Sequence, residues 1–235
     1  MKLNGATIPD EIVRRVVASR GREHCFAELN PARTALVVID LQHAFMNPAV
    51  GHAVVPSAID IVPAVNRLAA AVRQARGGVF WVRMTHDERC LDDWSVAFEI
   101  STPERRQKRI AALTAGSLGH SLWPDLDVRP EDEIVDKYRY SGFLPGTSDL
   151  ADRLRARGFD TVLITGTVTN VCCESSARDA AMLNFRTVMV SDGNAASSQA
   201  EHDAALTAFY NIFGDVMDTD MLVAALDRGH AAKAA

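Results

Sequence analysis

Three side chains with complementary chemistry stand where predicted strands end. Asp40 closes one apolar run of strand length, Lys137 closes another, and Cys172 follows a third by a few residues. In an open α/β sheet, ligands bind in the crevice outside the carboxyl ends of the strands. A carboxylate, an ammonium and a thiol at that rim are the parts of a thiol nucleophile with its own acid and base.

Each of these residues also has an ordinary structural interpretation. An aspartate at a strand end often caps a turn, and a single lysine is more often a solvated surface group. A cysteine early in a helix is more often a small core residue than a nucleophile. The joint placement of Asp40, Lys137 and Cys172 at strand ends favours the catalytic hypothesis over these alternatives.

The elements that must position these residues alternate between strands and helices along the chain. Apolar runs of strand length fall at residues 34–40, 79–84, 133–137, 161–166, 187–192 and 215–217. Helices are predicted between them, at residues 58–74, 103–113, 148–157, 170–183 and 199–213. Buried-type strands that alternate with helices indicate a mostly parallel sheet covered on both faces. We therefore expect an α/β protein with a three-layer α-β-α, Rossmann-like fold and a sheet of about six strands.

One domain, residues 33–228, accounts for this pattern, because no linker, repeat or low-complexity stretch interrupts it. Residues 1–32 are predicted to form an N-terminal helical extension, with a helix from about Pro9 to Ser19, and residues 229–235 a C-terminal tail. The apolar stripe on that helix needs a surface to cover it. We expect that surface to belong to a partner subunit.

Length, charge and cysteine use exclude several classes of protein. The chain has 235 residues, of which 48% are hydrophobic, so it can bury a sizeable core. Its net charge of −5 argues against a nucleic-acid partner and against a polybasic membrane surface. We find no apolar leader and no run of about 18 apolar residues, so neither a signal peptide nor a membrane span is expected. Four cysteines without a CxxC spacing favour a reduced, cytoplasmic setting.

Three segments resemble the isochorismatase-like cysteine hydrolases. GTVTNVCCESSARDA (166–180) resembles that family's nucleophile motif, Gly-x-x-Thr-x-x-Cys followed by a polar helix that carries Ala-Arg-Asp-Ala. ALVVIDLQHAF (35–45) resembles the first strand with its catalytic aspartate, and DKYRYSGF (136–143) resembles the segment with the catalytic lysine. The order Asp, Lys, Cys is that of the family, and the similarity covers roughly residues 34–226.

The resemblance implies a role for each member of the triad. Cys172 matches the nucleophile, Asp40 the general acid/base and Lys137 the residue that orients and balances the charges. The motif selects Cys172 over the adjacent Cys173, which we interpret as a core residue. A helix N-terminus and a nearby ammonium both favour the thiolate. The expected reaction hydrolyses a C–N amide or carbamoyl bond of a small molecule through a thioester acyl-enzyme.

The resemblance also implies an oxyanion site beside the nucleophile. A non-proline cis peptide is expected between Thr167 and Val168, which turns the Val168 N–H towards the oxyanion next to the N–H of Cys172. Four further side chains are candidates for substrate contact, although core packing is the default for the aromatic ones: Phe45, Trp81, Tyr140 and Thr169.

The sequence can be compared with three branches of the family. Isochorismatases proper cleave a vinyl ether and need no thiol, so Cys172 argues against that branch. Nicotinamidases hold a divalent metal through an Asp-x-His pair, which the string MTHDER (84–89) lacks, so we expect neither a metal nor another cofactor. The third branch holds metal-free amidohydrolases that act on small N-carbamoyl or amide acids, such as the ureidoacrylate and N-carbamoylsarcosine amidohydrolases. The strings RYSGF (139–143) and TNVCCES (169–175) look most like the ureidoacrylate group.

The region that should shape specificity, residues 84–113, does not match the ureidoacrylate group well. It and its surroundings are rich in arginines that suit a substrate carboxylate: Arg83, Arg89, Arg105, Arg106 and Arg109. The sequence therefore does not identify the substrate. The alternatives of a nicotinamidase-type enzyme, a lactam or ester hydrolase, and a thiol switch formed by Cys172 and Cys173 also stay open. Because the family is usually dimeric or tetrameric, a homodimer or homotetramer is expected.

Overall fold

A single parallel sheet organises the molecule. The structure, a computed structural model, describes residues 1–87 and 89–234. Its main sheet has six strands in the order β5-β4-β3-β6-β7-β8, and every neighbouring pair runs parallel. The strands are β3 (Thr34–Ile39), β4 (Gly78–Met84), β5 (Glu133–Lys137), β6 (Thr161–Thr167), β7 (Arg186–Ala195) and β8 (Asp215–Met217). The predicted α/β class and six-stranded parallel sheet are thus confirmed.

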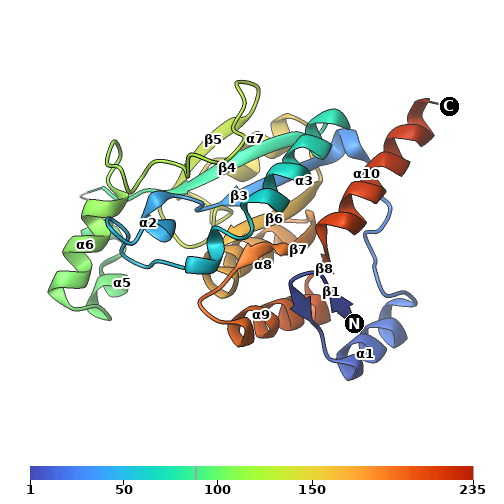
Figure 1. The fold of residues 1–235 in the computed structure, drawn as a ribbon, viewed down its shortest axis with the longest axis horizontal. Helices are drawn as coiled ribbons and strands as arrows, with labels where there is room; N and C mark the ends of the chain where they lie inside the picture. Colours follow the sequence, from blue (N-terminus) through green and yellow to red (C-terminus); the bar gives the residue numbers. More distant parts are fainter. Residues whose placement is uncertain (88, 235) are drawn as a thin grey trace.

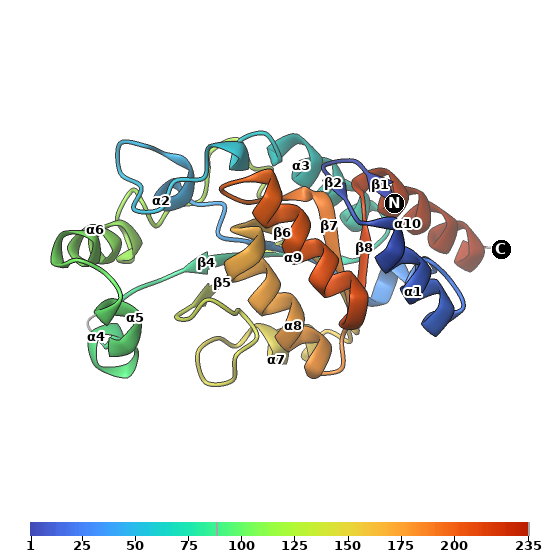
Figure 2. The same ribbon diagram turned by 90° about the horizontal axis from the view of Figure 1, so that it is seen from below.

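Helices cover both faces of the sheet. One face carries α3 (Val62–Gln74) and α10 (Thr219–Ala234), and the other carries α7 (Leu150–Ala156), α8 (Glu174–Met182) and α9 (Gln199–Ile212). Successive strand residues point to opposite faces, so Leu36 and Val38 pack under the first pair of helices, whereas Val37 and Ile39 pack under the others. Figures 1 and 2 show α8 and α9 on the side of the sheet away from α3 and α10. The result is the expected three-layer sandwich.

Several element boundaries differ from the prediction. The helix expected from residue 58 begins only at Val62, after a 3₁₀ turn, η2 (Pro56–Ala58). Pro63 then sits in the first turn of α3, where its missing N–H costs nothing. The helix expected over 170–183 is divided into a π-helical turn, η3 (Thr169–Cys173), and α8.

The N-terminal extension folds back onto its own chain. It contains a small antiparallel pair, β1 (Lys2–Leu3) and β2 (Ala6–Thr7), followed by α1 (Asp10–Arg20) and a 3₁₀ turn, η1 (Pro31–Arg33). Helix α1 contacts α9, and its Val16 is 2% exposed. Part of the stripe is therefore covered within the chain, whereas Val17 is 37% exposed, so cover of the rest by a partner subunit stays a prediction. The oligomeric state itself stays a prediction.

The C-terminal segment is helical where a tail was expected. Helix α10 runs through residues 229–234, and residue 235 lies outside the described residues. Gly229 does not end the helix, because it lies against Pro31 and the Leu29 carbonyl, a place too narrow for a Cβ. Within the described ranges, no helix has both the length and the apolar content needed to cross a bilayer.

A helical insertion lies beyond the carboxyl end of β4. It consists of α4 (Cys90–Asp93), α5 (Ser95–Glu99) and α6 (Pro103–Leu113) and connects β4 with β5. Figures 1 and 2 show this group at one end of the molecule, far from α1 and α10 and close to α2 (His43–Met46), which follows β3. Side chains from the insertion can therefore reach the rim at which the sequence places the chemistry.

Candidate active site

A buried ion pair joins two strand ends at this rim. Lys137 Nζ, from the end of β5, lies 2.8 Å from Oδ2 of Asp40, the residue that follows β3. Neither side chain has any exposed area. Asp40 adopts a left-handed backbone conformation with φ of 56°, and its N–H donates to the Val82 carbonyl at 2.9 Å. Strand β4, which lies between the two, thereby holds the Asp40 backbone at the sheet rim.

A buried amide ties the ends of β3 and β4 together. Gln42 Nε2 donates to the carbonyls of Met84, at 3.1 Å, and His120, at 2.9 Å. Its Oε1 accepts a bond of 2.8 Å from the Met84 N–H. Every polar atom of this side chain is thus occupied inside the protein. Gln42 supports the geometry of Asp40 and does not face the substrate, a role visible in the sequence only as a polar residue after a strand.

A glycine permits the close approach of β6 to β3. Gly166 pairs with Ile39 and has φ of 119°. A Cβ placed on it would lie 2.0 Å from the Ile39 carbonyl oxygen, so no other residue fits without displacing one strand. This contact fixes the end of β6, where the segment that carries Cys172 begins. Cys172 thus approaches Asp40 and Lys137 from the end of β6.

Burial dominates the protonation of the triad. It raises the pKa of Cys172 to about 12, although the Lys137 charge acts in the opposite direction. It also raises the pKa of Asp40, again against Lys137. Burial lowers the pKa of Lys137, but the negative charges of Asp40 and Cys172 outweigh it and keep that pKa above its ordinary value. Cys172 therefore rests as a thiol, because the Lys137 charge does not offset the effect of burial, and the lysine does not by itself generate a thiolate.

The two adjacent cysteines have different surroundings. Cys172 lines a cavity of about 240 Å³, whereas Cys173 is wholly buried among core side chains. The Cys173 thiol lies 3.9 Å from the carbonyl oxygen of Thr165, on β6. Only Cys172 is in a position to meet a small molecule.

The cavity collects some of the predicted residues and not others. Phe45, Tyr140 and Val168 line it together with Cys172. The peptide bond between Thr167 and Val168 is cis. Trp81 does not line the cavity; it is fully buried under α3, with its Nε1 donating to Asp132 at 2.8 Å. Thr169 does not line it either, because its hydroxyl bonds His202 Nδ1 at 2.9 Å inside the protein.

The rest of the cavity wall is cationic or apolar. Arg105 and Arg109, two of the arginines that the sequence offers for a substrate carboxylate, line it, and so does His52. The lining residues that the sequence did not indicate are Ala53, Met84, Ser101, Leu113 and Val171. Burial lowers the pKa of His52 to about 3, with the charge of Arg109 adding to the effect, so this imidazole is neutral. No periodic signal marks His52, which lies in a Pro- and Gly-containing loop.

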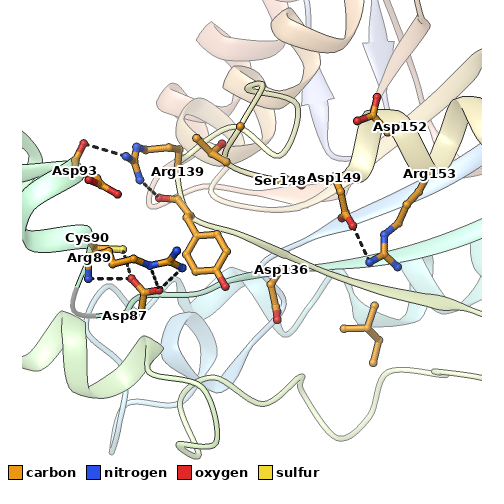
Figure 3. A pocket seen from close by; sticks show the side chains of 14 residues that line it. Asp87, Arg89, Cys90, Asp93, Asp136, Arg139, Ser148, Asp149, Asp152 and Arg153 are labelled. Atoms are coloured by element: carbon orange, nitrogen blue, oxygen red, sulfur yellow. Dashed lines mark hydrogen bonds and ion pairs between the residues drawn. The ribbon is translucent and has the colours of Figure 1, made fainter.

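A larger groove of about 630 Å³ lies nearby but holds different chemistry (Figure 3). It runs along β5, the edge strand, whose Asp136 faces the groove while the next residue, Lys137, faces the buried site. Several of its charges are paired with each other, as in the contacts of Arg89 with Asp87 and of Arg153 with Asp149. None of the triad lines it, so size alone does not identify the reactive cavity.

The described side chains near the cavity do not form a metal site. Across residues 1–87 and 89–234, no group of three or more His, Cys, Asp or Glu side chains is arranged to hold a metal ion. Seven histidines are present in the chain, and those near the cavity, His52 and His86, are held by aromatic neighbours.

Comparisons with known proteins give a consistent result. A family model described as "Isochorismatase domain" matches residues 34–221. The ureidoacrylate amidohydrolase RutB of Methylobacterium radiotolerans is 32% identical over 213 residues, which cover 84% of this chain and 81% of that protein. RutB of Pseudomonas savastanoi pv. phaseolicola is 30% identical over 232 residues, 92% of this chain and 91% of that protein.

Solved structures agree. A cysteine hydrolase from Pseudomonas syringae pv. phaseolicola superposes with a TM-score of 0.73 at 30% identity, over 86% of this chain and 95% of that one. The N-carbamoylsarcosine amidase of Thermoplasma acidophilum gives a TM-score of 0.63 at 25% identity, over 80% of this chain and 97% of that one.

Proposed function

Because this chain belongs to the isochorismatase family, we propose that it hydrolyses a carbon–nitrogen bond in a small amide or carbamoyl compound. The observation that carries the proposal is the meeting of Asp40, Lys137 and Cys172 at one end of a small cavity. Relatives named for ureidoacrylate and for N-carbamoylsarcosine support a carbamoyl or amide group as the target.

In the first half of the proposed reaction, Asp40 acts as the base. Its carboxylate takes the proton of the Cys172 thiol, which is fully protonated at rest, and the sulfur attacks the substrate carbonyl carbon. The Lys137 ammonium keeps Asp40 ionised before this transfer. The backbone N–H groups of Val168 and Cys172, both on the cavity wall, stabilise the oxyanion that forms.

In the second half, Asp40 acts first as an acid. It returns the proton to the leaving nitrogen, the C–N bond breaks, and a thioester to Cys172 remains. Water then attacks the thioester while Asp40 takes one of its protons, and the proton passes to the departing thiolate. The acid product leaves with both the thiol and the carboxylate restored. Phe45 and Tyr140 form the wall that holds the substrate.

The proposal is tested by ammonia release from the purified protein. The panel holds ureidoacrylate, N-carbamoyl amino acids, maleamate, nicotinamide and simple amides. We expect turnover of at least one of these by the wild type, loss of it in Cys172→Ala, and retention in Cys173→Ala, the matched control from the same helical turn. Turnover restricted to nicotinamide points to the nicotinamidase-type alternative instead.

A thiol switch makes the opposite prediction. It needs both cysteines and does not need the carboxylate, so Asp40→Asn would leave it intact while both cysteine variants abolish it. A homodimer or homotetramer in the same preparation is expected, and a light-scattering mass equal to one chain would contradict it.

A further inference from the structure

An unusual cation lies in the wall of the cavity that contains Cys172. Arg109, on α6, is 8% exposed, and its guanidinium packs over three aromatic rings. The distances from its Cζ to the ring centroids are 5.0 Å for Trp94, 5.1 Å for Phe98 and 5.6 Å for Tyr140. Stacking of this kind holds the planar guanidinium in one orientation but does not neutralise its charge.

No carboxylate among residues 1–87 and 89–234 pairs with Arg109. Its polar contact is His86, whose Nε2 lies 3.4 Å from Nη2. Burial lowers the pKa of His86 to about 3, with the charge of Arg109 contributing, so this imidazole is neutral. The histidine therefore accepts a hydrogen bond from the guanidinium and positions it, and no carboxylate of the described residues compensates the positive charge.

Two neighbouring arginines have carboxylate partners, and a third donates to a backbone carbonyl. Arg83 forms an ion pair with Asp136 at 2.9 Å, and Arg89 forms one with Asp87 at 2.6 Å. Arg106 donates to the Phe98 carbonyl. Of the five arginines that suit a substrate carboxylate in the sequence, only Arg105 and Arg109 line the cavity, and no aspartate or glutamate within residues 1–87 and 89–234 lines it with them.

A buried charge is normally paired, because leaving water without a partner costs several kcal/mol. We propose that the missing partner is the substrate: this cavity takes a small amide or carbamoyl acid whose carboxylate binds Arg109, with Arg105 at the exposed rim. The inference rests on the proposed function, since the scissile carbonyl of the same molecule must reach Cys172. Tyr140 contacts both regions, because it lines the cavity and covers the guanidinium.

The size of the cavity limits the rest of the molecule. Its volume of about 240 Å³ is below the range of roughly 300–1,000 Å³ that drug-sized ligands occupy. A planar carboxylate suits the fork of the guanidinium, which donates two parallel hydrogen bonds. The substrate class is thus a compact acid that carries its amide or carbamoyl group a few bonds from the carboxylate.

Two matched pairs of substrates test this assignment. Maleamate and maleamide share the scissile amide, and N-carbamoylglycine and N-carbamoylglycinamide share the carbamoyl group; only the carboxylate differs within each pair. We expect kcat/KM to favour the acid. In Arg109→Gln, kcat/KM for the acid should fall about 10- to 100-fold, the usual effect of removing a charged hydrogen-bond donor, mainly through KM.

Substitutions at Arg109 and Lys108 distinguish a loss of carboxylate binding from a loss of structure. Arg109→Gln should lower kcat/KM for the neutral partner much less than for the acid, and Arg109→Lys, which keeps the charge but not the fork, should fall between wild type and Gln on the acid. Lys108→Gln removes the same charge from the adjacent, exposed position of α6 and should alter neither substrate. Equal losses on the acid and on the neutral compound would overturn the proposal, because they indicate a structural role for Arg109.

A binding measurement distinguishes this inference from the proposed function. Calorimetric titration of N-carbamoylglycine and N-carbamoylglycinamide into Cys172→Ala needs no hydrolysis. The inference is supported if Cys172→Ala binds the acid more tightly than the amide and if adding Arg109→Gln removes this preference. This result holds even if the wild type turns over no compound, in which case only the hydrolase proposal fails. Amide hydrolysis without preference for the acid would support the hydrolase proposal but overturn the role of Arg109. Equal binding of the acid and the amide would also overturn the role of Arg109.

Discussion

Lys137 Nζ lies 2.8 Å from Asp40 Oδ2, and solvent reaches neither side chain. Two opposite charges removed from water gain little net stability from each other, because the desolvation cost offsets their attraction. The pair is therefore better explained by what it does to Asp40, whose burial alone raises the pKa of the carboxyl group. The Lys137 ammonium acts against that rise and so favours the ionised form of Asp40 beside the protonated Cys172 thiol.

Removing the lysine should damage both chemistry and stability. In Lys137→Met, Asp40 loses its counter-charge, its pKa rises further, and kcat/KM should fall about 10²- to 10⁴-fold as the base becomes protonated. The free energy of unfolding at neutral pH should fall by about 3–5 kcal/mol. Because the folded variant then binds a proton that the unfolded chain releases, its stability should improve as the pH is lowered. Urea unfolding at several pH values measures this.

The double variant Asp40→Asn/Lys137→Met is the control for that experiment. It contains no unpaired buried charge, so it should be more stable than Lys137→Met although it is equally inactive. A double variant that is less stable than Lys137→Met would show that the ion pair does not act as described.

Alkylation should report the protonation of the nucleophile. Since burial raises the pKa of Cys172 to about 12, the thiolate fraction, and with it the rate of labelling by iodoacetamide, should rise about tenfold per pH unit above neutrality. Peptide mapping by mass spectrometry assigns the label, and Cys172→Ala serves as the blank. A rate that levels off below pH 8 contradicts a protonated resting thiol.

Gly166→Ala should impair the protein even though it adds one methyl group. The new Cβ would meet the Ile39 carbonyl, and the residue would have to hold φ of 119°. We expect a loss of more than about 1 kcal/mol in the free energy of unfolding, together with reduced kcat, because β3 and β6 both lead into the site. Gly146→Ala has nothing within 4 Å of its added Cβ and a φ of 78°, so it isolates the cost of backbone conformation alone.

The N-terminal extension should make stability depend on pH. His24 Nδ1 lies 2.9 Å from Asp215 Oδ1; burial lowers the pKa of His24, but the hydrogen bond and the charge of Asp215 outweigh it and raise the pKa above 6.5. The stabilising contribution is therefore complete below pH 6.5 and lost as the pH rises through the folded-state pKa. The difference in Tm between wild type and His24→Gln should be largest in acid and shrink in alkali. A constant difference contradicts the linkage.

Local pattern predicted most of the sheet and its covering helices. The apolar runs that became β3, β4, β6 and β8 are short, bounded by turn residues and buried on both faces, which is the condition under which such runs identify parallel strands. The edge strand β5 was also predicted, although one of its faces is partly exposed. The convergence of Asp40, Lys137 and Cys172 followed from the rule that these strands end at one rim. Helix α10 was missed because its small residues and Gly229 give little helical periodicity.

The cavity wall could not be predicted in the same way. Trp81 occupies the position in β4 that turns towards α3, and a single strand residue does not reveal which face will meet a helix and which a cavity. Arg109 was one of five arginines that suited a carboxylate, and only the packing of Trp94 and Phe98 around it distinguishes it from its paired neighbours. Tertiary contacts, and not spacing, decide such roles.

The helical insertion α4–α6 separates the residues assigned to substrate recognition from those assigned to bond cleavage. The groups assigned to bond breaking stand at the ends of sheet strands, whereas the arginine assigned to recognition stands on a helix outside the three layers. Substitutions in the insertion can therefore redirect the enzyme to a new molecule without disturbing its hydrolytic centre. To change the substrate, residues of α5 and α6 should therefore be randomised, whereas β3, β5 and β6 should be left unchanged.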